Sequence, residues 1–319
     1  MCEPHSEQLL DILRQLTVAL TWYRPLKLHK LLIAALIGLL LGSIFATENG
    51  MRIYNRPDPN ATVASALARA TGSDWEPARI AARDGTPLEG WLFTPRTANG
   101  DDVIVLHGVG DTREGMMGHA RLLLEAGYTV LAPDARGHGS SGGTIISYGV
   151  REAGDVHDWC DWLLLRRPTE RLYGLGRSMG AAILLESLPR EPHFRAVVAE
   201  CPFPTFEEIA YYRLGQVSHL PRAPLWPIVH LGFAYAQLRY GIDLYRASPA
   251  EAVRHTAVPI LLIHGMSDTN IPPSHSVRLH ALNPATQLWL VPGAGHLEAP
   301  AVDPARYTRT VIGWFQSHP

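Results

Sequence analysis

Cysteine and charge are the residue classes of which this 319-residue sequence has little. Its three cysteines, Cys2, Cys160 and Cys201, lie far apart without CxxC spacing, which argues against a zinc site and against a disulfide framework. Charged residues amount to 18%, the formal net charge is −2 and no basic stripe dominates. Nucleic acid is therefore not expected as a partner. The sequence also lacks internal repeats, and at this length it can form one large domain or two small ones.

Charge is missing altogether from residues 31–47, LLIAALIGLLLGSIFAT. As a helix rising about 1.5 Å per residue, this run spans roughly 26 Å, slightly less than a hydrocarbon core of about 30 Å, and Lys30 can snorkel to supply part of the difference. We predict a transmembrane anchor over residues 31–47, after an N-terminal segment 1–30 and before a linker 48–75. A cleaved signal peptide is the main alternative. The long leader argues against it, as does branched Ile44 just before a possible cleavage after Ala46.

Basic residues flank this run unequally. Arg24, Lys27 and Lys30 precede it, whereas Arg52 and Arg56 follow it together with acidic residues. The positive-inside rule then favours a cytoplasmic N-terminus. We expect a single-pass membrane protein whose larger part lies on the non-cytoplasmic side.

Strand and helix signals alternate from about residue 76 to the C-terminus. Residues 78–95 indicate two strands joined around an Asp84–Gly85 turn. Later apolar runs, such as DVIVLHG at 102–108, are short and bounded by turn residues, as is typical of buried parallel strands. The alternation predicts an α/β domain over residues 76–319, with a mostly parallel central sheet and helices on both faces.

Residues 202–255 interrupt the alternation. They are rich in Pro, Tyr, Trp and Leu, and they are too long for an ordinary loop between strand and helix. We interpret them as a helical cap insertion over an active site, the alternative being an irregular insertion that only packs.

Ser178 stands between two glycines in the stretch YGLGRSMGAAILLES, residues 173–187. A strand, a G-x-S-x-G sequence and a helix in this order predict a nucleophile elbow, in which side chains at the glycine positions would collide with the neighbouring strand and helix. The N-terminus of the following helix would add a positive dipole end near a developing oxyanion. A lone G-x-S-x-G is a weak signal, but its place within the α/β pattern makes Ser178 the predicted nucleophile.

A serine hydroxyl needs a base, and the base needs an orienting acid. On an α/β sheet these partners follow the serine in the order acid, then histidine, each past a later strand. Asp268 follows the strand in LLIHGMSDTNIP and His296 follows the strand in LVPGAGHLEAP, so we predict Asp268 as the acid and His296 as the base. The same argument prefers Asp268 to Asp303 and Glu298. His264, inside the end of its strand, is expected to pack or to hydrogen-bond locally.

An oxyanion hole needs two backbone N–H groups. We expect them from Met179, directly after the serine, and from Val109, in the loop after VIVLHG. The HGVGD sequence at 107–111 lacks the third glycine of a dinucleotide-binding fingerprint, and that interpretation is rejected. Neither a cofactor nor a metal is expected.

These stretches together resemble the α/β-hydrolase superfamily over residues 76–316, in particular its membrane-anchored, BEM46-like and serine aminopeptidase/lipase-like branch. The similar segments are VLHGVGDTREG, LAPDARGHGSSGG, GVREAGDVHDWCDWL, GLGRSMGAAI, VPILLIHGMSDTNIP and GAGH. The resemblance implies a serine hydrolase that acts on esters, thioesters or amides without a cofactor. It also implies that the turn from Asp134 to Ser141 supports the elbow, with Arg136 and His138 non-catalytic.

Three functions are compatible with these residues. The leading hypothesis is cleavage of a carboxylic ester or thioester through an acyl-enzyme on Ser178, with a small-molecule acyl ester or a lipid-like substrate, because the cap is apolar and the chain carries a membrane anchor. The alternative is a peptidase or aminopeptidase on the same triad. Glu200, Glu207 and Glu208 are its candidates for holding a substrate amine, although Glu200 ends a strand and can serve within the scaffold. The third is a non-catalytic membrane-anchored scaffold, against which the complete triad argues.

Overall fold

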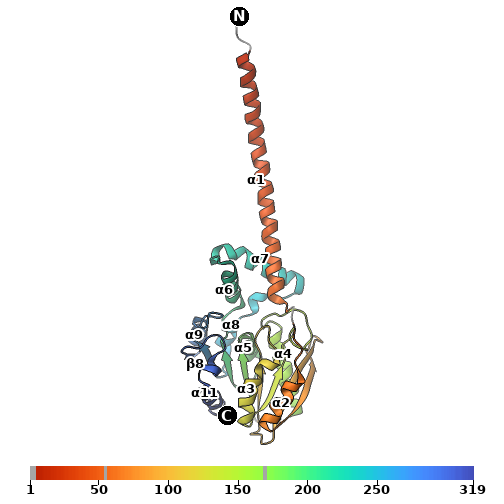
Figure 1. Ribbon diagram of the computed structural model, residues 1–319, viewed down its shortest axis with the longest axis vertical. Coiled ribbons are helices and arrows are strands. Elements are labelled where there is room, and N and C mark those ends of the chain that lie inside the picture. The colour runs from red at the N-terminus through yellow and green to blue at the C-terminus, as the bar shows by residue number, and fades with distance from the viewer. Residues whose placement is uncertain (1–4, 54–55, 168–170) are drawn as a thin grey trace.

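A long N-terminal helix stands out from a compact α/β body in the computed structural model, which describes residues 5–53, 56–167 and 171–319 (Figure 1). This helix, α1 (His5–Met51), has 47 residues. Its part Leu28–Met51 is long and apolar enough to cross a membrane, and it is the one such helix within the described ranges. The predicted run of residues 31–47 lies inside it.

Residues 48–75, which we expected to be a linker, contain regular structure. Helix α1 continues to Met51, helix α2 (Ala61–Thr71) follows, and strand β1 begins at Ser73. Asn60 caps α2, because its side chain accepts a hydrogen bond from the N–H of Thr62. The buried face of α2 consists of Ala64, Leu67 and Ala68. With one large apolar side chain on that face, the sequence shows little of the periodicity that reveals a helix.

An eight-stranded sheet forms the centre of the body, in the order β1-β2-β4-β3-β5-β6-β7-β8. Strand β2 pairs antiparallel with both β1 and β4, and the remaining pairs are parallel. The strands are β1 (Ser73–Ala81), β2 (Pro87–Pro95), β3 (Asp101–Leu106), β4 (Thr129–Pro133), β5 (Arg171–Arg177), β6 (Phe194–Glu200), β7 (Ile260–Gly265) and β8 (Thr286–Val291). The prediction of a mostly parallel sheet is confirmed.

Helices cover both faces of this sheet, as predicted. One apolar layer packs α2, α3 and α11 on the sheet, and a second layer packs α4, α5, α8 and α9 on the opposite face. The helices of the body are α3 (Met117–Glu125), α4 (Glu152–Arg166), α5 (Met179–Ser187), α8 (Pro249–His255), α9 (Ser274–Leu282), α10 (Ala299–Val302) and α11 (Pro304–Gln316). Short 3₁₀ turns are η1 (Arg113–Met116), η2 (Leu188–Arg190) and η3 (Leu244–Arg246). The sheet therefore has an apolar layer on each side, as a parallel sheet requires.

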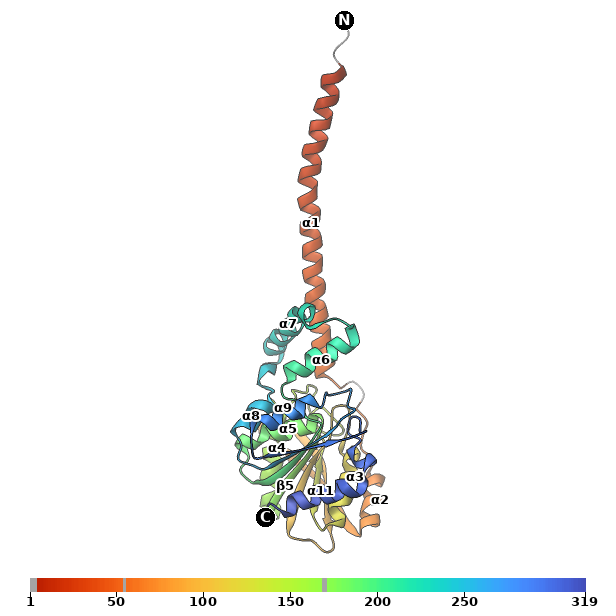
Figure 2. The ribbon, with the colours of Figure 1, turned by 90° about the vertical axis from the view of Figure 1, so that its left-hand side faces the viewer.

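Two further helices, α6 (Phe206–Ser218) and α7 (Arg222–Tyr240), form the cap within residues 202–255. They lie between the body and the protruding part of α1 (Figure 2). A third apolar cluster holds the cap together, with Phe206 stacked on Phe233 and with Met51 from the end of α1. Helix α8, in contrast, packs on α5 and belongs to the body.

The end of α1 is tightly packed against α7. Ser43 is buried, and a Cβ atom on Gly232 of α7 would collide with the hydroxyl of Thr47. The missing side chain at Gly232 thus lets the two helices approach closely, as small residues do where helices cross. The next residue, Glu48, forms an ion pair of 2.6 Å with Arg52 and accepts a hydrogen bond of 2.8 Å from Tyr235. The last turns of α1 are therefore packed as part of the cap.

Candidate active site

Ser178 occupies the turn between β5 and α5 in a backbone conformation that few non-glycine residues adopt, with φ 52° and ψ −115°. Its neighbours have no room for side chains. A Cβ on Gly176 would lie 2.5 Å from the carbonyl oxygen of Gly180, and one on Gly180 would collide with the carbonyl oxygens of Leu106 and His107. The N–H of Ser178 donates a 2.8 Å hydrogen bond to the carbonyl of Glu200 on β6. Strand, turn and helix thus present the hydroxyl at the carboxyl end of the sheet.

The structure brings Ser178, His296 and Asp268 together. His296 Nε2 lies 3.1 Å from Ser178 Oγ, and His296 Nδ1 lies 2.7 Å from Asp268 Oδ2. Both partners stand in loops that follow later strands, Asp268 after β7 and His296 after β8. A base within hydrogen-bond reach of a hydroxyl, itself oriented by a carboxylate, is the arrangement that activates a serine as a nucleophile.

Asp268 has other hydrogen-bond partners besides His296. Its Oδ1 accepts hydrogen bonds from the backbone N–H groups of Asn270 and Ile271, at 2.8 and 2.9 Å. A second histidine, His264, places Nε2 3.2 Å from Asp268 Oδ2. Burial alone would raise the pKa of Asp268, but the hydrogen bonds from His264, His296 and the Ile271 backbone outweigh it and hold that pKa below its usual range. The acid is therefore ionised when His296 is protonated.

His264, which we expected to pack or to hydrogen-bond locally, makes such local hydrogen bonds and also contacts the acid. It is fully buried, and its Nε2 lies 2.9 Å from the carbonyl of Ile271 while its Nδ1 lies 2.6 Å from the hydroxyl of Ser276. These partners assign the Nε2–H tautomer, because Nδ1 accepts from the serine and Nε2 donates to the carbonyl and the carboxylate. Its signal in the sequence was its position at the strand end, four residues before Asp268.

Val109 and Met179 line the same cavity as Ser178. Met179 is the first residue of α5, and Val109 follows Gly108 in the loop after β3. This loop approaches the serine closely, since a Cβ on Gly108 would lie 3.4 Å from the Cβ of Ser178. The structure therefore places both predicted oxyanion-hole residues beside the hydroxyl.

Two buried histidines hold that loop on either side of Val109. His107 Nδ1 donates to the carbonyl of Gly108 at 2.8 Å, and the N–H of Gly110 donates to His138 Nε2 at 3.2 Å. Accepting from Gly110 requires the neutral form of His138. Burial, together with the neighbouring His107, lowers the pKa of His138 to about 4 and so keeps it neutral.

The turn that contains His138 is itself fixed by buried ionic contacts. Asp134 accepts backbone hydrogen bonds from Arg113 and Ser140, at 2.8 and 2.9 Å. Arg136 forms hydrogen bonds of 2.7 and 2.5 Å to the Asp155 carboxylate on α4. The turn from Asp134 to Ser141 thus links the Val109 loop to the body, and Arg136 does not line the cavity at Ser178.

A cavity of about 260 Å³ opens at Ser178, bounded by α6, α7 and the end of α1. Its polar side chains are those of Thr47, Tyr148, Ser178 and Arg213, and the rest of its wall is apolar. No carboxylate belongs to this wall among the residues that the structure describes.

The three glutamates considered for amine binding have other partners. Glu200 is buried, accepts a hydrogen bond from Tyr307 and lies 3.5 Å from His119. Glu208 pairs with Arg278 through contacts of 2.6 and 2.7 Å, and Glu207 lies 3.5 Å from Arg222. The structure does not bring these carboxylates to the cavity.

Within the described ranges, one group of side chains has the composition of a metal site. One ligand atom each from Cys201, Asp268 and His296 lies within 4.8 Å of the others. Burial raises the pKa of the Cys201 thiol to about 12, which disfavours the thiolate that a metal requires. The hydrogen bonds of Asp268 and His296 instead serve the contact with Ser178.

Comparisons with known proteins place this geometry among hydrolases. Residues 99–232 match the family described as serine aminopeptidase, S33. The chain is 31% identical over 237 residues to the Bacillus subtilis (strain 168) protein YqkD, covering 73% of this chain and 72% of that protein. It is 29% identical over 234 residues to YfhR of Escherichia coli (strain K12), covering 70% and 74%.

Solved structures agree on the fold. An esterase from Pyrococcus furiosus superposes with a TM-score of 0.67 at 24% identity, over 84% of this chain and 98% of that one. A proline iminopeptidase from Mycobacterium smegmatis superposes with a TM-score of 0.58 at 18% identity, over 76% of this chain and 98% of that one. Esterases and peptidases thus share the fold, so the fold does not distinguish between these substrate classes. The residues that line the cavity must distinguish them.

Replacing Gly180 tests the packing of the elbow. We expect Gly180→Ala to lower the free energy of unfolding by roughly 1–3 kcal/mol, because its methyl group meets the backbone of β3 and the adjoining loop. Gly154→Ala in α4 is the matched control, since a Cβ there meets nothing within 4 Å, and it should be neutral or stabilising by up to about 1 kcal/mol. Thermal and denaturant unfolding measure both. Equal stability of the two variants would contradict this account.

The neutral state of His138 makes the stability of the fold sensitive to acid. An unfolded histidine takes up a proton near pH 6.5, whereas His138 in the folded chain does so near pH 4. Its contribution is therefore complete above pH 6.5 and falls as the pH drops toward 4, by up to about 3 kcal/mol. We expect His138→Gln to reduce the slope of unfolding free energy against pH in this window. The same slope in the variant and the wild type would show that His138 is not buried in its neutral form.

Proposed function

The chain belongs to the α/β-hydrolase superfamily, and on that premise we propose that it is a membrane-anchored serine hydrolase that cleaves carboxylic esters or thioesters. The observation that carries the proposal is the apolar cavity at Ser178, whose described wall contains no carboxylate. An acyl chain needs apolar contact and no ionic partner, so this cavity suits the acyl part of an ester.

The reaction follows from the distances around the serine. His296 Nε2 accepts the proton of Ser178 Oγ as the oxygen attacks the carbonyl carbon, and the carbonyl oxygen becomes an oxyanion. The N–H groups of Val109 and Met179 stabilise this oxyanion. His296 then protonates the leaving alcohol or thiol, which departs and leaves the acyl group on Ser178. A water molecule, deprotonated by His296, attacks the acyl-enzyme, and the carboxylic acid and the free serine are released.

Asp268 acts by stabilising the protonated histidine. Its carboxylate lies 2.7 Å from His296 Nδ1, and its lowered pKa keeps it charged throughout the cycle. His264 holds the same carboxylate from the other side, so the acid keeps its orientation while His296 changes charge. His264 is thus a positioning residue.

An aminopeptidase is the second candidate, favoured by the description of the matching family. Such an enzyme binds a protonated substrate amine, for which a carboxylate near the nucleophile is the natural partner. Glu200, Glu207 and Glu208 are engaged elsewhere, which supports the ester over the peptide. A series of p-nitrophenyl esters compared with aminoacyl anilides on the same preparation separates the two.

We further propose that α1 stays attached as the anchor. The helix is continuous from His5 through the apolar run to Met51, and its last turns pack into the cap. Removal of the chain up to Ala46 as a signal peptide would take away part of the cavity wall and the buried Ser43. The basic residues before the span support a location of the body on the non-cytoplasmic side.

Loss of the serine hydroxyl should abolish turnover while leaving the fold intact. We expect Ser178→Ala to lower kcat for a p-nitrophenyl ester by 10³-fold or more, because the hydroxyl supplies the chemistry and little packing. A fluorophosphonate probe should label the wild type and not the variant. Labelling that persists in Ser178→Ala would show that Ser178 is not the nucleophile.

The orienting acid is tested by a pair of carboxylate variants. Asp268→Asn is expected to lower kcat by roughly 10³–10⁴-fold, because the amide cannot stabilise the protonated histidine. Asp303→Asn is the control, since Asp303 caps α11 through a 3.0 Å hydrogen bond from the N–H of Arg306, which asparagine also accepts. Activity lost only in the Asp303 variant would overturn the choice of acid.

The proposed anchor and its orientation can be tested directly on the full-length protein. We expect the mature protein to keep residues 31–47, to remain with the membrane after a carbonate wash, and to be digested by protease added to sealed spheroplasts. N-terminal sequencing and protease accessibility measure this. A mature chain that starts near Thr47 would refute the anchor, and a body protected in spheroplasts would reverse the orientation.

A further inference from the structure

The end of α1 lies inside the cavity that contains the serine. Ala46, Thr47, Gly50 and Met51 belong to the same wall as Ser178. Residues 46, 47 and 50 share one face of a helix, because positions three and four apart lie above one another. These residues also belong to Leu28–Met51, the segment long and apolar enough to span a membrane. One helix thus reaches from the candidate span into the active-site cavity.

Several contacts hold this wall in place. The carbonyl of Gly50 accepts a 2.5 Å hydrogen bond from the hydroxyl of Tyr148, and the carbonyl of Met51 accepts a 2.9 Å bond from the N–H of Ile146. One helical turn away, Thr47 lies directly against Gly232 of α7. Backbone contacts to the body and side-chain contacts to the cap therefore fix the end of α1 relative to Ser178.

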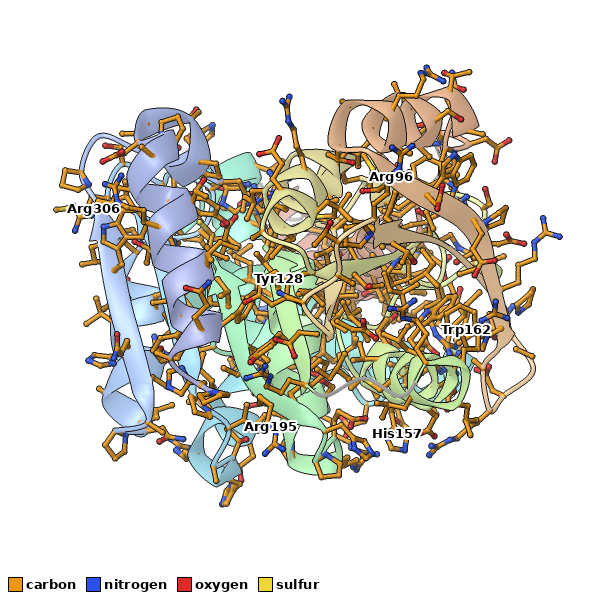
Figure 3. The ribbon with its side chains drawn as sticks, turned by 90° about the horizontal axis from the view of Figure 1, so that it is seen from below. Arg96, Tyr128, His157, Trp162, Arg195 and Arg306 are labelled. Atoms are coloured by element: carbon orange, nitrogen blue, oxygen red, sulfur yellow. The ribbon has the colours of Figure 1, made fainter. Side chains whose placement is uncertain are left out.

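The surface around this end of the molecule carries exposed apolar side chains among exposed basic ones, Arg213, Arg222 and Arg239. Large apolar side chains on α6, on α7 and on the turn between them are exposed, Trp226 by 59% and Leu238 by 88%. Helices α6 and α7 lie at the base of the protruding part of α1 (Figures 1 and 2). Most large apolar side chains of α1 from Leu28 to Phe45 are exposed as well. The face remote from α1 also carries exposed arginines, such as Arg96, Arg195 and Arg306 (Figure 3), but within the described part of the chain no apolar helix protrudes from it. Apolar side chains of this kind next to a spanning helix are suited to the boundary of a bilayer.

We propose that the cavity receives the acyl chain of a lipid ester from the bilayer in which α1 is embedded, and that Gly50 determines how long a chain fits. The proposal rests on the proposed ester hydrolysis and adds to it the source of the substrate and the residue that limits its length. A Cβ on Gly50 meets nothing within 4 Å, and its backbone is helical, so a larger side chain there enters free space without backbone strain. Such a side chain takes the volume that a long acyl chain would occupy.

Graded substitutions at Gly50 test the length limit. In the full-length protein in detergent, we expect Gly50→Leu to lower kcat/KM for p-nitrophenyl palmitate at least tenfold relative to kcat/KM for p-nitrophenyl butyrate. Gly50→Ala should produce a smaller change in the same ratio. The matched control is Gly42→Leu, two turns earlier on the exposed surface of α1, where a Cβ also meets nothing within 4 Å; it should keep the wild-type ratio. Fluorophosphonate labelling and the unfolding temperature show that each variant is folded.

The outcomes separate this proposal from the one on which it rests. If Gly50→Leu is folded and labelled but keeps the wild-type ratio, the α1 wall does not limit chain length and the inference is overturned. If the wild type hydrolyses no ester of any length, the proposed function fails instead.

A separate experiment tests whether the substrate comes from the bilayer. The protein is reconstituted into vesicles of phosphatidylcholine that also hold a fluorogenic long-chain ester, or it is mixed with separate vesicles that hold the ester. We expect hydrolysis in the first arrangement and at least tenfold slower hydrolysis in the second. Equal rates in both arrangements would show that the ester arrives through water, which contradicts delivery from the bilayer.

Discussion

Ser178 is held in an unfavourable backbone conformation, and the arrangement of the site depends on that constraint. A non-glycine residue at φ 52° and ψ −115° costs of order 1–3 kcal/mol, which the surrounding packing must offset. Gly176 and Gly180 make the offset possible, because they let β5, α5 and the loop after β3 approach without side chains between them. This closeness points the hydroxyl at His296 and brings the Val109 loop beside it. The same close packing therefore maintains the strained backbone of Ser178 and the positions of the groups around its hydroxyl.

The second constraint lies between α1 and the cap. Gly232 gives Thr47 room to pack on α7, and Ser43 is buried in the same contact. The glycine therefore couples the candidate membrane span to the wall of the cavity. If α1 is the proposed anchor, this contact fixes the position of the cavity relative to the bilayer, which an ordinary tether would leave undefined. On the proposed anchoring and acyl binding, membrane attachment and substrate selection would both depend on α1.

Much of the fold followed from local patterns, and the parts that did not follow depend on distant contacts. The G-x-S-x-G spacing and the strand ends before Asp268 and His296 are short-range signals, so the sheet and the meeting of these residues were predictable. The role of α1 in the cavity was not, because it rests on a pairing of Thr47 with Gly232, 185 positions later in the sequence. Helix α2 was missed since alanines dominate its buried face. Neither a contact between distant residues nor a helix face made mostly of alanine produces a clear hydrophobic period in a single sequence.

The central claim is that an acyl group bound to Ser178 extends along the end of α1. A long-chain alkyl fluorophosphonate with a diazirine near the far end of its chain tests this claim directly in the full-length protein. After reaction and illumination, mass spectrometry should find the phosphonate on Ser178 and the cross-link within residues 46–51 or on the facing residues of α7. A phosphonate on Ser178 with cross-links confined to the body, away from both helices, would contradict the account.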